Sequence, residues 1–420
     1  MDFSLSEEQE MLKTMARDFL ETEYPESVIR ETTGSDTGYS PELWRKIADL
    51  GWMGIIFPEQ YGGTEQSVID LAVLYEEMGR GLFASPHLST VVLCGNTILA
   101  AGSEEQKADL LPRIVNGEVI LSLALAEPES SWDGKTWEPE GVTVTATPDG
   151  DDYIINGTKL FVHDAHVADS ILCATRTKTD GAPEDGITLF LMDAMSPGIT
   201  CNLLDTVSGD NKQSEVVFDK VRVPKKSIVG ELNGGWAPLA RSMQIGAVML
   251  CAQMVGAGQK VLELTVDYAR TRIQFDMPIG INQHVQAHCV YLVADVDTSR
   301  WVTYLAAWKL SENMDCDLDV AIAKAWTSEA YESACWYSHQ VFAGVGSTEA
   351  LGVIPFYTRL GNLCQYYLGS PNEHMEVIAR ELEKLPSPER PKGKPLGLWE
   401  PGREQLPTWD IWREYYQKNR

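Results

Sequence analysis

Apolar residues recur with helical spacing through the N-terminal quarter of the chain. Leu12, Met15 and Phe19 fall on one helical face, and Ser4 with Glu7 forms a capping-box sequence just before them. Further helices are predicted to begin at Pro41 and to run over residues 68–78, 86–99 and 104–116. The pattern therefore predicts a helical N-terminal domain over residues 1–118.

The periodicity changes near Val119 from helical to alternating. Residues 142–147 alternate with period two, and the turn at 148–151 leads into a second strand at 153–155. Other short strands are predicted at residues 120–125, 187–192 and 215–218. These segments predict a small β-domain over residues 119–232.

Helical spacing returns after residue 233. Ile245, Met249 and Ala252 share one face, and small residues beside them favour close helix packing. Helical patterns continue and predict a C-terminal helical bundle over residues 233–385. The tail, residues 386–420, contains tryptophans at 399, 409 and 412. It is predicted to be either a loose tail or a segment that docks on a neighbouring surface, because exposed tryptophan is costly.

Composition places the chain among ordinary globular proteins. It has 420 residues, of which 44% are hydrophobic and 23% charged. No run of about eighteen apolar residues predicts a membrane-spanning helix, and the N-terminus does not resemble a secretory signal. The eight cysteines are scattered singly and form no CxxC pair. This pattern indicates free thiols in a reducing compartment, which favours the cytoplasm, and no metal site.

The net charge of −27 bears on binding partners. Nucleic acids and anionic membranes are polyanions that such a surface repels, so neither is an expected partner. The charge does not predict an acidic ligand either. Its simplest consequence is solubility.

Two sequence motifs stand out in the helical C-terminal part. Residues 272–279 read Arg-Ile-Gln-Phe-Asp-Met-Pro-Ile, followed by Gln283, and residues 340–346 read Gln-Val-Phe-Ala-Gly-Val-Gly. With the α–β–α order of domains, these segments resemble the acyl-CoA dehydrogenase family over about residues 3–382. The resemblance implies a helical N-terminal domain, a small β-barrel middle domain and a C-terminal four-helix bundle. It also implies FAD as cofactor, an acyl-CoA thioester as substrate and a tetramer.

The resemblance assigns cofactor roles to residues of these motifs. Arg272, Phe275 and Gln283 match positions that reach the FAD of an adjacent subunit, and a planar guanidinium suits a pyrophosphate. Asp276 replaces the glycine of the family motif. Gln340 and Gly344 match the turn that approaches the adenylate half. The alternatives are a surface arginine at a helix end and an ordinary turn between helices.

The ring-binding side departs further from the family pattern. Ala126, Ser131 and Trp132 stand where the family has threonine, glycine and serine, and Trp132 either occludes the substrate channel or forms a stacking wall. Phe161 replaces a tryptophan that backs the flavin. His163 replaces a threonine that bonds it; a neutral imidazole can donate one such bond, and a surface-strand histidine is the alternative. Residues 218–224 with Gly230 match the closing strand of the family's β-domain.

The catalytic glutamate of the family is missing. Leu368 occupies its usual position and Gly246 the position used by some members, and no acid lies between Glu231 and Glu263. Glu373 is out of register. A leucine or glycine cannot accept a proton. In the same loop, Ser370 and Asn372 match cofactor-binding positions and Gly369 a substrate-binding one.

Three hypotheses follow. The chain is the subunit without a base in a heteromeric (α2β2) dehydrogenase of a bulky or cyclic acyl-CoA, paired with a homologous subunit. Alternatively, it is a homotetrameric flavoenzyme with other leaving-group chemistry or another base, for which His87 is the candidate. His87 is otherwise a surface residue at a helix start. The third hypothesis is a binding or structural homologue without catalysis.

Overall fold

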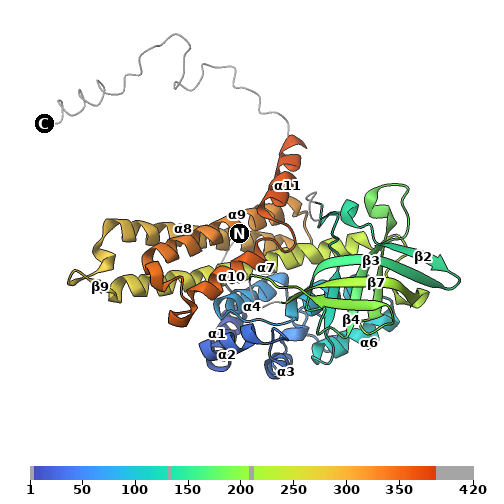
Figure 1. Cartoon of the computed structure of the whole chain (residues 1–420), viewed down its shortest axis with the longest axis horizontal. Helices are drawn as coiled ribbons and strands as arrows, with labels where there is room; N and C mark the ends of the chain where they lie inside the picture. The colour runs from blue at the N-terminus through green and yellow to red at the C-terminus, as the bar shows by residue number, and fades with distance from the viewer. Residues whose placement is uncertain (1–3, 131–134, 208–211, 385–420) are drawn as a thin grey trace, which may run out of the picture. The chain divides into compact units, whose positions relative to one another are not determined.

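The computed structural model describes residues 4–130, 135–207 and 212–384. Contacts within the chain divide it into two compact units, residues 1–378 and 379–420. The first unit contains the helical, β and bundle parts discussed below (Figure 1). Of the second, the described part is the end of one helix. The predicted tail over residues 386–420 lies outside the described residues.

The N-terminal part is helical, as the apolar spacing predicts. The α-helices are α1 (Glu7–Glu23), α2 (Glu26–Gly34), α3 (Pro41–Asp49), α4 (Val68–Arg80), α5 (Asn96–Ala101) and α6 (Glu104–Val115). The capping box was predicted two residues too early: Ser6 is the N-cap of α1 and exchanges hydrogen bonds with Gln9, not Ser4 with Glu7. A π-helix, Leu88–Gly95, replaces most of the α-helix predicted at 86–99.

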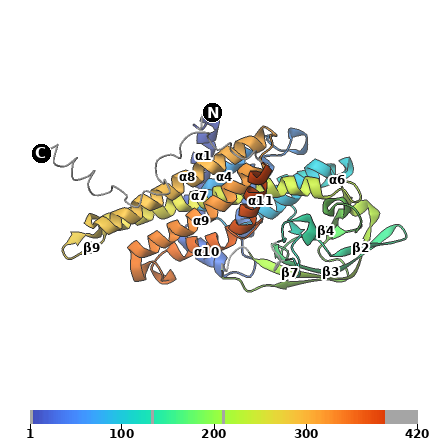
Figure 2. The same ribbon diagram turned by 90° about the horizontal axis from the view of Figure 1, so that it is seen from above.

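The middle part is an eight-stranded sheet (Figure 2). Its strands are β1 (Leu121–Ala124), β2 (Thr145–Asp149), β3 (Asp152–His163), β4 (Ser170–Arg176), β5 (Ile187–Asp193), β6 (Ile199–Leu203), β7 (Gln213–Pro224) and β8 (Ile228–Val229). Their order is β6-β7-β3-β2-β4-β5-β8, with β1 beside β4. The sequence pattern missed β4, β6 and β8.

Five α-helices and a short hairpin form the C-terminal part. They are α7 (Trp236–Thr271), β9 (Ile273–Gln274), β10 (Met277–Pro278), α8 (Gln283–Ser311), α9 (Asp317–Phe342), α10 (Ile354–Cys364) and α11 (Pro371–Lys384). Within the described residues, the 3-10 turns are Trp52–Gly54, Glu59–Tyr61, Pro139–Gly141, Pro183–Gly186, Lys225–Ser227, Ile279–Ile281, Ala343–Val345 and Glu349–Leu351. The domain types and their order confirm the predicted fold class.

The helix α7 is the central element of the first unit. It is long and apolar enough to cross a membrane by length and composition, but 78% of its apolar window is buried, as in a core helix. Glycines allow α4 to cross it closely: a Cβ on Gly256 would lie 1.6 Å from the Glu76 carbonyl oxygen, and one on Gly79 would lie 1.9 Å from that of Gln253. This crossing fixes the N-terminal helices against the bundle.

Candidate active site

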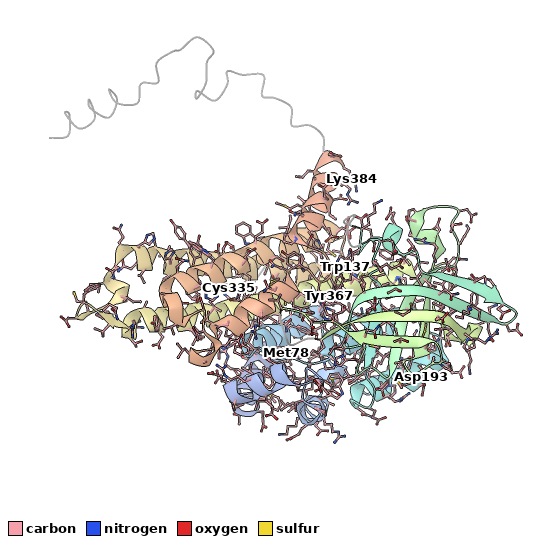
Figure 3. All side chains as sticks on the ribbon, in the orientation of Figure 1. Met78, Trp137, Asp193, Cys335, Tyr367 and Lys384 are labelled. Atoms are coloured by element: carbon pink, nitrogen blue, oxygen red, sulfur yellow. The ribbon has the colours of Figure 1, made fainter. Side chains whose placement is uncertain are left out.

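A cavity of about 620 Å³ opens where the loop before α11 meets strands β3 and β7. Phe161, Ser370 and Asn372, three of the predicted cofactor residues, line it together. The other lining residues are Thr136, Trp137, Gln213, Asn362, Leu363, Tyr366, Tyr367 and Glu373. Figure 3 places Trp137 and Tyr367 at this junction between the bundle and the sheet. The structure thus brings segments distant in sequence to one concave site.

Tyr367 is the centre of an aromatic cluster beside the cavity. Its ring meets the edge of Trp137 at 5.2 Å between centroids and lies 3.8 Å from the ring of His163, tilted by 33°. Burial raises the pKa of the Tyr367 hydroxyl above its ordinary range. The tyrosine is therefore a neutral wall of the site, and its position is fixed by its two neighbours.

His163 is buried behind this wall and does not line the cavity. Only 5% of it is exposed, so the alternative of a surface histidine is wrong. Burial lowers its pKa to about 3, which makes the imidazole neutral at physiological pH. Its Nε2 lies 2.7 Å from Nε2 of Gln213, which does line the cavity. Gln213 is a site residue that the sequence motifs did not reveal.

The loop that carries Leu368 is held from two sides. The buried Lys324 donates hydrogen bonds to the carbonyls of Gln365 (3.0 Å) and Gly369 (2.7 Å). His374 Nε2 lies 2.9 Å from the carbonyl oxygen of Leu368. Leu368 itself has φ of 59°, a backbone conformation that costs a non-glycine residue free energy. The loop is therefore held in one conformation by buried polar contacts.

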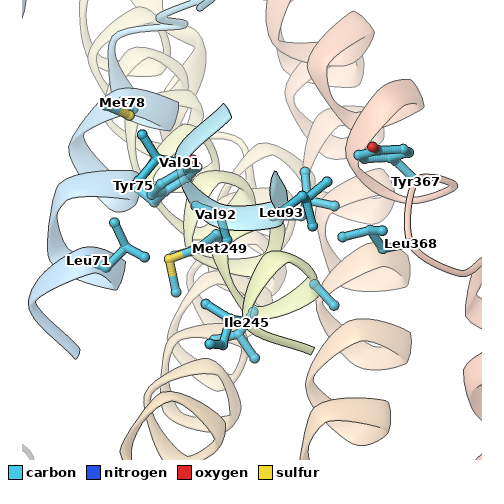
Figure 4. Close-up of a cluster of buried hydrophobic side chains, with 14 of the residues drawn as sticks. Leu71, Tyr75, Met78, Val91, Val92, Leu93, Ile245, Met249, Tyr367 and Leu368 are labelled. Carbon is cyan, nitrogen blue, oxygen red and sulfur yellow. The ribbon is translucent and has the colours of Figure 1, made fainter. Parts of the chain in front are cut away.

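The two expected base positions meet in an apolar core, and Figure 4 shows Leu368 in this core with Leu93. A Cβ on Gly246 would lie 2.7 Å from Cδ1 of Leu368 and 2.9 Å from Cδ2 of Leu93. Leu368 is only 4% exposed, and Leu93 is fully buried. The volume that glycine leaves free is thus filled by two leucines. Gly246 therefore does not by itself provide room for a larger acyl group.

His87 has the contacts of a structural histidine. It is 1% exposed, so the prediction of a surface residue is wrong. Its Nε2 lies 3.1 Å from the Trp52 carbonyl, which can only accept, and its Nδ1 lies 2.9 Å from the Tyr75 hydroxyl. Nε2 therefore carries the proton, Nδ1 accepts, and burial lowers the pKa to about 4. Neither nitrogen is left to take a proton from a substrate.

Asp164 is a titratable group that does not line the cavity and that the sequence motifs did not single out. It directly follows His163, is partly buried, and accepts a hydrogen bond of 2.6 Å from Ser89 on the π-helix. Burial raises the pKa of its carboxyl to about 6, and its charge raises the pKa of Tyr367. The sequence signal that could have identified Asp164 is its position directly after the strand that carries Phe161 and His163.

A buried ion pair joins two of the motif segments. Nζ of Lys159 lies 2.6 Å from Oε1 of Glu127, and both side chains are almost fully buried. Glu127 also accepts from the backbone N–H of Thr143 and Val144, and Lys159 donates to the Leu125 carbonyl. Glu127 and Lys159 therefore have structural roles.

Ala126, one of the predicted cofactor residues, lies buried beside this pair. Its carbonyl accepts the backbone N–H of Leu160, which ties the segment after β1 to β3. Ser131 and Trp132 lie outside the described residues, so the predicted occlusion or stacking by Trp132 stays a prediction.

The residues expected to face a neighbouring subunit gather at the other end of the bundle. Arg272, Gln283, Gln340 and Gly344 are all exposed there, and Phe275 is 98% exposed at the tip of the β9–β10 hairpin. Tyr268 and Phe342 stack at 4.3 Å, which joins the ends of α7 and α9 beneath these residues.

The predicted cofactor residues at the cavity and those at the β9–β10 hairpin are far apart. Arg272 follows Gly246 by 26 residues along α7, a rise of about 39 Å. This is further than one FAD molecule spans. Arg272 therefore lies far along α7 from the contact of Gly246 with Leu368, near the β9 end of the bundle (Figure 1).

The cavity fits the ring half of FAD. Its aromatic walls suit a flavin ring, and Ser370 and Asn372 offer polar contacts. Among its lining residues the one charged side chain is Glu373, so the cavity brings no cation to a pyrophosphate.

Comparison with known proteins assigns the chain to a family. The model of the acyl-CoA dehydrogenase N-terminal domain matches residues 6–118, that of the middle domain residues 122–221, and that of the C-terminal domain residues 233–383. The chain belongs to the acyl-CoA dehydrogenase family. It is accordingly of the FAD-dependent oxidoreductase type that acts on CH–CH groups.

Individual relatives resemble the chain over nearly its whole length. The probable acyl-CoA dehydrogenase YngJ of Bacillus subtilis (strain 168) is 28% identical over 389 residues, which cover 91% of this chain and 100% of YngJ. The structure of butyryl-CoA dehydrogenase from Megasphaera elsdenii matches with a TM-score of 0.83 and 27% identity, covering 91% of this chain and 100% of that one. The FAD complex of PigA matches with a TM-score of 0.83 and 26% identity, covering 91% and 99%.

Proposed function

We propose that this chain is the subunit without a catalytic base in a heteromeric acyl-CoA dehydrogenase that acts on a bulky or cyclic acyl-CoA. The observation that carries the proposal is the apolar contact of Gly246, Leu368 and Leu93. Removal of an α-proton needs a base within hydrogen-bond reach, and both expected positions hold side chains that cannot accept one.

Under this proposal the chain contributes binding groups. The aromatic cavity of one chain holds the flavin ring, and the exposed Arg272 and Phe275 of another chain reach the rest of the cofactor. Bound FAD supplies the acceptor for hydride from the β-carbon of the acyl group. A homologous partner with a glutamate supplies the base.

The acyl group binds at the partner's site in this proposal. Leu93 and Leu368 fill the space at Gly246 in this chain, so a ring-containing acyl chain finds no room there without rearrangement. The eight cysteines are all free, which fits a reducing compartment, and we place the assembly in the cytoplasm.

The first test of the proposal is an absorption spectrum. It is recorded for the chain purified alone and for the chain purified together with a glutamate-bearing homologue from the same source. The expected result is tight FAD binding only in the mixed assembly, with no flavin reduction by acyl-CoA thioesters when the partner's glutamate is replaced by glutamine. Flavin reduction by the chain alone contradicts the proposal. Failure of both preparations to bind FAD favours the binding or structural homologue.

A second function is favoured by Asp164, a carboxyl whose pKa is raised by burial and whose charge raises the pKa of Tyr367. In a homo-oligomeric flavoenzyme this group would act as the base in place of the missing glutamate. The discriminating variant is Asp164→Asn in the chain purified alone. Under this second function it abolishes flavin reduction and leaves FAD binding intact. Under the first, the chain alone reduces no flavin with either residue.

A further inference from the structure

Gln213 is the polar side chain that the sheet presents to the cavity. It begins β7 and pairs across the strands with His163, the last residue of β3. Its amide Nε2 lies 2.7 Å from Nε2 of His163. An amide NH2 can only donate, so the neutral imidazole accepts at Nε2 and carries its own proton on Nδ1. The histidine therefore fixes which way the amide of Gln213 faces.

This bond leaves half of the amide available. The second N–H and Oε1 of Gln213 remain, and within residues 4–130, 135–207 and 212–384 no group donates a hydrogen bond to Oε1. Gln213 is partly buried, so an unpaired oxygen there is costly. A ligand that offers one N–H beside one carbonyl satisfies both remaining groups.

The other walls of the cavity are aromatic and suit a planar ring. Phe161 is 40% exposed and Tyr366 is 60% exposed, and both line the cavity with Trp137. Aromatic faces of this kind stack on planar heterocycles. The cavity thus combines flat apolar walls with one amide that has a donor and an acceptor side by side.

We propose that Gln213 binds the imide edge of the flavin ring and that His163 positions it. The Oε1 atom accepts the hydrogen bond of the imide N–H, and the free amide N–H donates to an adjacent ring carbonyl. This inference rests on the proposed function, in that it places the flavin ring in this cavity. It replaces the predicted direct contact of His163 with the flavin by an indirect role.

The test compares FAD with 3-methyl-FAD, in which a methyl group replaces the imide hydrogen. Dissociation constants are measured by fluorescence titration of the apoprotein in the assembly that binds FAD. We expect the wild-type protein to prefer FAD by about tenfold or more. Gln213→Leu reduces that preference to less than about threefold, because the acceptor is gone. Gln213→Met is the second variant if the leucine variant does not fold.

Two further variants distinguish a loss of the orientation of Gln213 from a general loss of protein structure. His163→Leu keeps Gln213 but releases its orientation, so the preference for FAD falls and the absorption bands of bound flavin shift. Gln60→Leu, at an exposed position outside the cavity, keeps the wild-type preference. Tight binding of both cofactors with equal preference in wild type and Gln213→Leu overturns the inference and leaves the proposed function standing. Absence of flavin binding in every assembly overturns both.

Discussion

Gly246 and Leu368 are in contact across the expected base position: a Cβ on Gly246 would lie 2.7 Å from Cδ1 of Leu368. We expect Gly246→Ala to lower the free energy of unfolding by about 1–3 kcal/mol, because the added methyl overpacks a filled site. Leu368→Ala removes a buried side chain and costs about 2–5 kcal/mol. The double variant is expected to lose less than the sum, since each change relieves the other.

Urea denaturation of the four proteins measures this coupling. The control is Gly34→Ala, because a Cβ on Gly34 has no atom within 4 Å and the change is expected to be neutral within about 0.5 kcal/mol. Strict additivity of the two substitutions at the site would show that the side chains do not share this space.

The sequence predicted that Leu368 and Gly246 stand at the positions of the base, but not what fills the space between them. Neither leucine nor glycine has a side-chain group that can take a proton. Their contact depends on the approach of the loop before α11 to α7, which no local pattern encodes. The same holds for His87: its burial follows from the tertiary contacts with Tyr75 and Trp52, and a helix-start sequence suggested exposure instead.

The buried pair of Glu127 and Lys159 gives a second prediction. Lys159→Met leaves the buried carboxylate without a counter-charge, and we expect a loss of about 3–5 kcal/mol in unfolding free energy. Combining it with Glu127→Gln recovers part of that loss, because no unpaired charge remains. The measurement is guanidinium denaturation followed by far-ultraviolet circular dichroism.

The matched control for this pair is Lys178→Met. Lys178 lies 3.7 Å from Asp180 in an ion pair that is largely exposed to solvent. Exposed pairs contribute little, so the expected loss is below about 1 kcal/mol. Equal losses for Lys159→Met and Lys178→Met would contradict the structural role of the buried pair.

Asp164 predicts a pH-dependent stability. Its pKa is raised by burial from 3.8 to about 6, so the folded protein binds more protons than the unfolded chain between these values. The charged carboxylate therefore destabilises the fold above pH 6, and this penalty disappears as the pH falls toward 3.8. Asp164→Asn keeps an acceptor for Ser89 and is expected to raise the unfolding free energy by about 1–3 kcal/mol at pH 8.

Denaturation at pH 8 and at pH 4.5 tests the direction in which the effect of Asp164→Asn on the unfolding free energy changes with pH. The gain from Asp164→Asn should shrink clearly at the lower pH, whereas Asp267→Asn, at an exposed position on α7, should give no gain at either. A gain that is larger at pH 4.5 than at pH 8 would falsify the assignment of a raised pKa.

Two of the missed strands, β4 and β6, were missed for a physical reason. β4 is buried over five consecutive residues and so shows no alternation, and β6 is exposed over four of its five residues. An alternation of apolar and polar residues identifies strands that have one buried face and one solvent-exposed face, such as β7. By contrast, two N-terminal helices, α4 and α6, begin at the predicted residues and end within two residues of the predicted ends, whereas α2 was missed.

Phe275 provides the prediction closest to function. It and Asp276 are the two central residues of the β9–β10 turn, with φ of 51° and 63°, and the phenyl ring is 98% exposed. A strained, exposed aromatic at a hairpin tip is expected to be buried by a partner. We expect Phe275→Ser to leave the unfolding free energy within about 0.5 kcal/mol of wild type. It should weaken FAD binding at least about tenfold, because the ring no longer covers the cofactor of the adjacent chain.

Flavin content per chain and thermal unfolding of the apoprotein together test this expectation. Met195→Ser is the control, because Met195 is 88% exposed on the β-domain and lies outside the predicted cofactor residues. It should change neither quantity. If Phe275→Ser retains full flavin content, the hairpin does not reach a neighbouring cofactor, and the shared site must be built from other surfaces. If it instead lowers the melting temperature of the apoprotein, the ring packs within its own chain, contrary to its exposure.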